Sequence, residues 1–176
     1  MHEETKRCAI YTRTSYQRKD DQHVTSIRNQ QATCQQIIET NAHLGWRTIP
    51  KTYSDQGASG STLDRPGLQC LLTDIRRGEI DIVIFYTLNR LSRNFMDFSR
   101  LVKAMNQHGV HFISIAENLD TSTTAGRLTL QTMLMLSDYQ LEDEPTTFFQ
   151  KIKQTIQQFR LLRWSFFTLR EKKNAN

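Results

Sequence analysis

Two stretches of this chain place serine and arginine residues directly after apolar runs. Residues 11–15 read Tyr-Thr-Arg-Thr-Ser and end a short apolar strand pattern, and residues 89–93 read Asn-Arg-Leu-Ser-Arg and follow the apolar run 80–86. A serine hydroxyl is a nucleophile, and guanidinium groups bind a phosphate and stabilise the charge that develops on it. These residue types indicate a metal-free attack on a phosphodiester.

Arg65 marks a third arginine site. It follows the loop-like residues 54–61, Ser-Asp-Gln-Gly-Ala-Ser-Gly-Ser, and precedes Pro66, which suits the first position of a helix. Ser15 alone would be interpreted as a turn or helix-cap serine. Three arginine sites at neighbouring strand ends, however, can converge on one phosphate.

The order of the expected elements predicts an open α/β sheet. Strands are expected at residues 6–12, 46–53, 80–86 and 110–116, and helices at 26–44, 66–78 and 94–108, where apolar residues recur at helical spacing. The run 80–86 is apolar on both faces, which is typical of a strand inside a parallel sheet. Strands that alternate with helices place their working loops at the carboxyl ends of the strands.

A long helix is expected from about Ala125, with apolar residues on more than one face. Such a helix needs two partners, its own sheet and something else. We expect Leu130, Met133, Leu134 and Met135 to be buried against a second subunit. Pro145 interrupts the pattern, and a further helix is expected from about Thr147.

The composition excludes several classes of protein. The 176 residues are 38% hydrophobic, with a mean hydropathy of −0.57, and no segment approaches the roughly 20 apolar residues of a membrane span. The charged start has no apolar stretch after it, so no signal peptide is predicted, and we expect the chain to stay in the cytoplasm. Cys8, Cys34 and Cys70 are expected as reduced core thiols. His108 and His111 flank a predicted turn without further ligands, so no metal site is predicted.

The net charge of +5 is unevenly distributed. Residues 145–176 contain seven Lys/Arg and one acid, which gives +6 and leaves −1 for residues 1–144. A basic tail is typical of a nucleic-acid-binding segment, although a solvated amphipathic helix without a ligand would have the same composition.

Taken together, these motifs resemble the resolvase/invertase family of serine site-specific recombinases. The resemblance covers roughly residues 6–141 and rests on stretches of residues 11–15, 26–30, 53–60 with Arg65-Pro66, 88–93, 109–121 and Gly126-Arg127. It implies an open, mainly parallel resolvase-like sheet with helices on both faces, followed by a long dimerisation helix. The implied divisions are a catalytic core (1–124), the dimerisation helix (125–144) and a basic helical tail (145–176).

The resemblance also implies a mechanism. Ser15 would attack a DNA phosphate and become joined to the 5′ end as a phosphoserine, with no metal and no ATP. Arg13, Arg65, Arg90 and Arg93 would bind the phosphate, and the supporting residues would be Tyr11, Gln30, Asp55 and Asn89. The expected DNA contacts are Arg127, Lys151, Lys153, Arg160 and Arg163. The implied partners are double-stranded DNA and further copies of the chain, as a homodimer and as a tetramer in a synaptic complex, in a prokaryotic cytoplasm.

The chain departs from the family pattern at three points. Asn89 stands where the family usually has aspartate, a Glu-Arg pair is missing after Tyr139, and Pro145 interrupts the helix. The carboxyl-terminal part is therefore expected to be divergent or truncated, without a recognisable DNA-binding domain. The alternative is a catalytically impaired recombinase that acts only as an oligomerisation or regulatory module. An unrelated flavodoxin-like regulator is disfavoured because no acidic cluster follows the strands.

Overall fold

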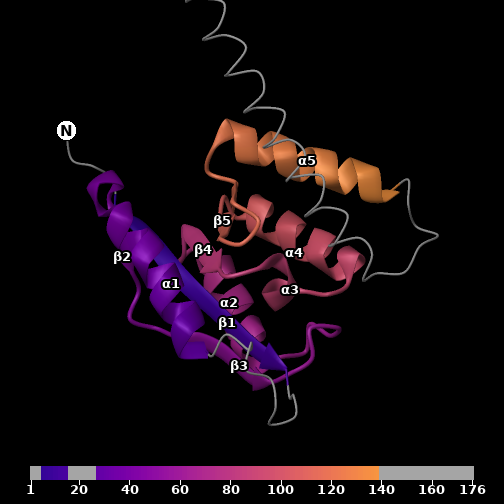
Figure 1. The fold of residues 1–176 in the computed structure, drawn as a ribbon, viewed down its shortest axis with the longest axis horizontal. Coiled ribbons are helices and arrows are strands. Elements are labelled where there is room, and N and C mark those ends of the chain that lie inside the picture. The colour runs from indigo at the N-terminus through magenta and orange to yellow at the C-terminus, as the bar shows by residue number, and fades with distance from the viewer. Residues whose placement is uncertain (1–4, 16–26, 139–176) are drawn as a thin grey trace, which may run out of the picture.

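The computed structural model describes residues 5–15 and 27–138, which form an α/β fold (Figure 1). Six strands and five α-helices follow one another along these residues. The strands are β1 (Lys6–Ser15), β2 (Trp46–Thr48), β3 (Tyr53–Gly57), β4 (Ile82–Phe85), β5 (His111–Ser114) and β6 (Leu119–Asp120). The helices are α1 (Ile27–Thr40), α2 (Pro66–Arg76), α3 (Leu88–Leu91), α4 (Phe95–Gln107) and α5 (Thr124–Asp138), with a 3₁₀ turn η1 at Ala42–Leu44.

The sheet is mainly parallel, with the strand order β2-β1-β4-β5-β6. Strand β1 pairs in parallel with β4 and, at its two ends, with β2 and β3, and only β6 runs antiparallel. Because β1, β3 and β4 are parallel, their carboxyl ends meet at one edge of the sheet, and the arginine motifs follow those ends.

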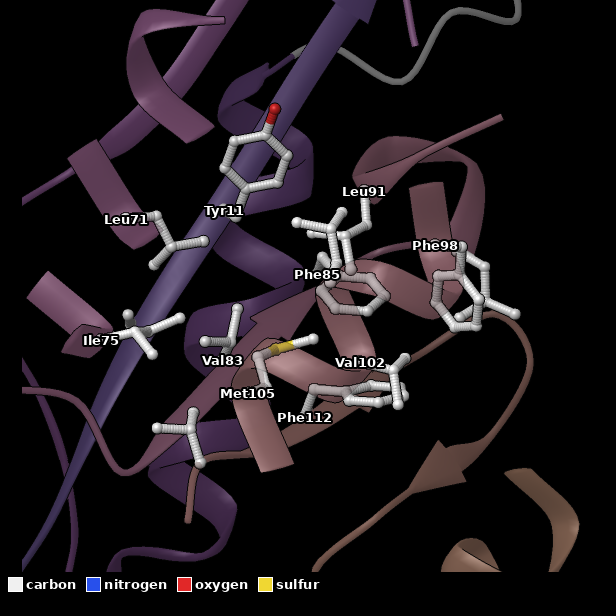
Figure 2. Close-up of a cluster of buried hydrophobic side chains, with 14 of the residues drawn as sticks. Tyr11, Leu71, Ile75, Val83, Phe85, Leu91, Phe98, Val102, Met105 and Phe112 are labelled. Carbon is white, nitrogen blue, oxygen red and sulfur yellow. The ribbon is translucent and has the colours of Figure 1, made fainter. Parts of the chain in front are cut away.

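Helices cover both faces of the sheet because the side chains of each strand alternate between faces. On one face, Cys8, Ile82 and Ile84 pack with Cys34 and Ile38 of α1. On the other face, Ala9, Tyr11, Val83, Phe85 and Phe112 pack with α2, α4 and part of α5. Figure 2 shows this second cluster, with the Tyr11 hydroxyl pointing away from the other labelled side chains. The predicted fold class is confirmed.

Several predicted boundaries were wrong. The strand expected at 46–53 is two strands, β2 and β3, on either side of Pro50, which has no N–H to donate to a sheet. Residues 54–57, expected as loop, belong to β3, and β1 continues to Ser15. The helix expected at 26–44 ends at Thr40 and is followed by η1. Asn94 caps α4 as predicted, since its Oδ1 accepts a hydrogen bond from the Asp97 N–H at 3.1 Å.

Helix α5 divides its apolar residues differently from the prediction. Leu130 and Met133 are buried in the chain's own core, with 4% and 6% of their surface exposed, so their expected burial against a partner is wrong. Leu134 is partly buried against the same core, whereas Leu128 and Met135 are exposed. The described part of α5 thus uses one face for its own sheet, and its role as a dimerisation helix stays a prediction.

The three cysteines are free thiols; Cys8 and Cys34 lie in the core as predicted, whereas Cys70 is only partly buried. Burial raises the pKa of the Cys8 thiol to about 11 and that of Cys34 to about 12, so both are protonated at neutral pH.

Among the helices of the described residues, none is long and apolar enough to cross a membrane.

Gly126 is expected to be intolerant of any side chain. A Cβ at this position would lie 1.7 Å from the Asp120 carbonyl oxygen, so α5 could not keep its place over β6. Helix propensity alone would make Gly126→Ala stabilising by about 1 kcal/mol, but the clash should reverse the sign to a loss of at least about 2 kcal/mol. Urea denaturation of the variant measures this loss in the free energy of unfolding.

Gly109→Ala is the matched control for Gly126→Ala. Gly109 has a φ of +67°, and a Cβ at this position would meet nothing within 4 Å, so only the left-handed backbone is penalised. That penalty is about 1 kcal/mol. Equal losses in the two variants would show that α5 does not approach β6 closely enough to exclude a methyl group.

Candidate active site

The predicted site residues come together at the carboxyl edge of the sheet. Strand β1 delivers Tyr11, Arg13 and Ser15, and the register of β3 sets Arg13 beside Asp55 and Ser15 beside Gly57. Helix α3 follows β4 directly and carries Asn89 and Arg90. Figure 1 shows the ends of β1 and β3 side by side. The structure describes the backbone of Ser15, at the last position of β1, and its side chain lies outside the described part.

Arg13 is fully buried and binds three main-chain carbonyls. Its Nη1 donates to the oxygen of Ala58 at 2.8 Å, its Nη2 to that of Asn89 at 2.9 Å, and its Nε to that of Arg90 at 3.2 Å. One guanidinium therefore joins β1 to the loop after β3 and to α3. Its fork of donors suits this task because it holds several acceptors in fixed directions.

Arg65 is the second buried guanidinium, with 1% of its surface exposed. Its Nη1 donates to the Arg90 carbonyl at 3.1 Å and to the Tyr11 hydroxyl at 2.8 Å, and its Nη2 donates to the Leu91 carbonyl. Arg13 and Arg65 thus meet at α3, where together they bind the carbonyls of its last three residues.

Asp55 anchors the network from the side of β3. Its Oδ2 accepts hydrogen bonds from the Tyr11 hydroxyl at 2.8 Å and from the Leu68 N–H at 3.0 Å, and its Oδ1 accepts one from the Gly67 N–H at 2.8 Å. A carboxylate is favourable there because it faces the amino-terminal end of α2. Burial, as the largest cause, raises the pKa of Tyr11, so its phenol stays protonated and donates to Asp55.

Arg90 and Arg93 are the more accessible arginines. Arg90 is half-buried on α3 and Arg93 is exposed just beyond it. The Arg93 N–H donates to the Gly60 carbonyl at 2.8 Å, and a Cβ on Gly60 would lie 2.9 Å from both Arg13 Nη2 and Arg93 Cγ. Because Gly60 has no side chain, the loop after β3 can pack between the buried Arg13 and the exposed Arg93.

The four arginines form a positive cluster, with no carboxylate partner in the described part of the chain. Across residues 5–15 and 27–138, the ion pairs join Arg7 to Asp81, Lys51 and Arg77 to Asp74, and Arg100 to Asp97, and none includes a cluster arginine. Burial, and then the charges of Arg93, Arg65 and Arg90, lower the pKa of Arg13 to about 10. Burial and then Arg93 lower the pKa of Arg90. A pKa of about 10 leaves Arg13 charged at neutral pH, and partly buried like charges favour an anionic ligand.

Gln30 and Asn89, two of the predicted supporting residues, each contact Arg13 through a hydrogen bond that involves the main chain. The Gln30 amide is buried and pairs with both main-chain groups of Arg13, accepting from its N–H at 3.4 Å and donating to its carbonyl at 3.3 Å. Asn89 contributes its main-chain carbonyl to Arg13, and its side chain is exposed. The asparagine side chain at position 89 therefore takes no part in this contact with Arg13.

Arg127, a further predicted DNA contact, is not part of this cluster. The Arg127 guanidinium donates to the Thr121 carbonyl at 3.2 Å, the Ser122 carbonyl at 2.8 Å and Thr124 Oγ1 at 3.1 Å, where it holds the turn before α5. The tail residues Lys151, Lys153, Arg160 and Arg163 lie outside the described residues, as do Tyr139 and Pro145.

The sequence interpretation assigned no role to Glu117. Its carboxylate accepts a hydrogen bond from the Leu88 N–H at 3.2 Å and one from the Ser114 hydroxyl. The available signal was an acid directly after the predicted strand 110–116, at the same sheet edge as the arginines. No group of three or more His, Cys, Asp or Glu side chains that could hold a metal ion occurs in the described ranges.

The chain matches a known protein family over most of its length. The model of the resolvase N-terminal domain family matches residues 8–146. The transposon Tn917 resolvase of Enterococcus faecalis is 34% identical over 101 residues, which are 57% of this chain and 52% of that protein. The DNA-invertase of Escherichia phage P1 is 34% identical over 85 residues, 48% of this chain and 45% of that protein. The chain thus spans about half the length of these curated relatives.

Solved structures show the same fold. The N-terminal catalytic domain of TP901-1 integrase matches with a TM-score of 0.64 and 34% identity, over 78% of this chain and 98% of that one. A resolvase family site-specific recombinase from Streptococcus pneumoniae matches with a TM-score of 0.63 and 21% identity, over 89% of this chain and 99% of that one. By its family match over most of its length and by its likeness to an integrase catalytic domain, the chain belongs to the resolvase family.

Proposed function

We propose that this chain cleaves and rejoins DNA strands as a serine recombinase, with Ser15 as the nucleophile. The observation that carries the proposal is the cluster of four arginines, which have no carboxylate partner among the described residues, at the strand end that also carries Ser15. A phosphodiester supplies the anion that such a cluster favours. Family membership and the relatives named resolvase, invertase and integrase support the same reaction class.

The proposed step is a transesterification. The oxygen of the Ser15 hydroxyl bonds to phosphorus and gives up its proton, the bond from phosphorus to the 3′ oxygen breaks, and that oxygen takes up a proton. The 5′ end is then a phosphoserine ester and the other end a free 3′ hydroxyl. Rejoining reverses the step with a new 3′ hydroxyl, and the bond energy stays in the ester, so the step itself consumes no ATP.

The arginines divide into two sets in this proposal. Arg90 and Arg93 make the first contacts with the phosphate because they are the accessible members. Arg13 and Arg65 add positive charge from their buried positions. They also fix the position of α3, because their guanidinium groups donate hydrogen bonds to its carbonyls. Guanidinium charge placed in advance around a phosphate stabilises the transition state without reorganisation during the reaction.

The proposed partners are double-stranded DNA and further copies of the chain. Cleavage of two duplexes and exchange of their ends require a dimer on each site and a tetramer in the synaptic complex. The proposed parts remain a catalytic core (1–124), a dimerisation helix (125–144), whose described residues expose Leu128 and Met135, and a DNA-binding basic tail (145–176). A silent interaction module would form the same assemblies without cleaving DNA.

A suicide duplex, nicked so that the cleaved end diffuses away, tests the proposed function. The expected result is a covalent protein–DNA complex in denaturing gels, and mass spectrometry should place the nucleotide on the peptide that contains Ser15. DNA binding without any adduct, under conditions where a known serine recombinase forms one, would favour the silent module.

DNA affinity is expected to depend mainly on charge and on the tail. Random and candidate-site duplexes should bind with dissociation constants of about 10⁻⁴–10⁻⁶ M, and about six phosphate contacts would weaken binding about a thousandfold between about 50 and 200 mM salt. Deletion of residues 145–176 should remove most of this salt dependence. Titration by fluorescence anisotropy measures both effects, and tight, salt-insensitive binding to one sequence would contradict them.

A further inference from the structure

Helix α3 carries Arg90 at the proposed phosphate site, but the helix has few interactions of its own that would stabilise it. It is a single turn of four residues, and a helix of this length is unstable in isolation. The residue before it, Thr87, makes no side-chain hydrogen bond to its free N–H groups. The position of α3 must therefore be set by side chains from other elements.

The carboxyl-terminal end of α3 is held by two cations. Arg13 binds the carbonyls of Asn89 and Arg90, and Arg65 binds those of Arg90 and Leu91. Positive charge at a helix carboxyl terminus is favourable and satisfies carbonyls that have no partner within the helix.

The amino-terminal end of α3 is held by an anion, Glu117. Its carboxylate accepts from the N–H of Leu88, the first residue of α3, at 3.2 Å, and from the hydroxyl of the fully buried Ser114. The turn that carries Glu117 is itself fixed to the sheet, because the N–H groups of Ile115 and Ala116 donate to the carbonyls of Phe85 and Tyr86. The carboxylate therefore has a fixed position relative to β4.

We propose that Glu117 is a positioning residue of the arginine cluster. Through α3 it fixes Arg90, and with it the geometry in which the phosphate is bound. Its catalytic consequence rests on the proposed function, whereas its effect on α3 does not. Loss of the carboxylate should let α3 shift, and misplacement of a transition-state contact by about 1 Å lowers a rate about 100-fold.

The experiment compares Glu117→Ala, Glu117→Gln and Asp120→Ala in the full chain. Both hydrogen bonds are made to the same carboxylate oxygen, Oε2, and the amide oxygen of glutamine can accept both, so this variant removes the charge and keeps the hydrogen bonds. Asp120 is the matched control, since it is a carboxylate on the strand after the same turn, and its Oδ1 accepts from the N–H and the hydroxyl of Ser122, away from α3. The readouts are the rate of adduct formation on the suicide duplex, the DNA dissociation constant, and hydrogen exchange of the Arg90 and Ser92 amides.

Glu117→Ala should slow adduct formation about 10- to 100-fold with an unchanged DNA dissociation constant, and Glu117→Gln should recover most of the rate. The two amides, which donate to the carbonyls of Thr87 and Leu88, should exchange about tenfold faster in Glu117→Ala and at the wild-type rate in Asp120→Ala. A wild-type adduct rate or wild-type exchange in Glu117→Ala would overturn the inference. If the wild-type chain forms no adduct, the proposed function fails, and the exchange rates alone decide whether Glu117 positions α3.

Discussion

Replacement of Ser15 by alanine is expected to abolish the covalent protein–DNA adduct completely and to leave DNA binding unchanged. The hydroxyl is the proposed nucleophile, and alanine has no group that could form an ester with phosphorus. Ser15 is the last residue of β1, paired through the main chain with Gly57, so alanine keeps the strand. Denaturing gels of the suicide-duplex reaction, followed by mass spectrometry of any shifted band, provide the measurement.

Ser59→Ala is the control for this substitution. Ser59 is an exposed serine in the loop after β3, and its hydroxyl lies 2.7 Å from that of Ser61. It lies in the same region of the molecule but has no proposed role, so its variant should form the adduct at the wild-type rate. An adduct that survives Ser15→Ala, or one that disappears only in Ser59→Ala, would refute the assignment of the nucleophile.

The sheet edge that carries this chemistry could be predicted because apolar runs mark its strands. Residues 82–86 are apolar on both faces, and this run contains the buried strand β4. Parallel strands bring their carboxyl ends to one edge, so the motifs that contain Arg13 and Arg90 had to approach one another. The observed hydrogen bond between the Arg13 side chain and the Arg90 carbonyl follows from that topology.

Strand β3 could not be predicted from composition. Residues 54–57 are polar or glycine and have the composition of a loop. They form a strand because their main chain pairs with the end of β1, and because Asp55 is held by Tyr11 and by the first turn of α2. These interactions are made with residues far away in the sequence, and the periodicity of apolar residues within a segment carries no information about such partners.

The roles within the arginine cluster also required coordinates. Sequence spacing does not distinguish among Arg13, Arg65, Arg90 and Arg93. In the structure the side chains of Arg13 and Arg65 are buried and bind main-chain carbonyls, whereas those of Arg90 and Arg93 are more accessible. Helix α3, which separates the two sets, is too short to show a helical period. In α5, the face that packs on the sheet is decided by the close approach of Gly126 to Asp120, and this turns Leu130 and Met133 inward.

Arg90→Lys is expected to slow adduct formation about 10²- to 10³-fold, the usual effect of removing one preorganised stabiliser of transition-state charge. An ammonium cannot reproduce the two parallel hydrogen bonds of a guanidinium to a phosphate. Burial and Arg93 already lower the pKa of Arg90, and a lysine in the same place would lose its charge more readily. Single-turnover kinetics on the suicide duplex at saturating protein measure the loss.

Two further variants show whether this loss reports the proposed site. Arg100→Lys changes an exposed arginine on α4 whose ion pair is with Asp97 and not with a residue of the cluster, and it should leave the rate unchanged. Asn89→Asp should give an equal or higher rate, because Asn89 serves Arg13 through its main-chain carbonyl and an aspartate keeps that contact. Near-wild-type kinetics for Arg90→Lys would mean that the phosphate does not depend on the guanidinium that α3 presents. A large loss in Asn89→Asp would instead show that added negative charge disturbs the cluster, and that asparagine is the residue this arrangement of arginines requires.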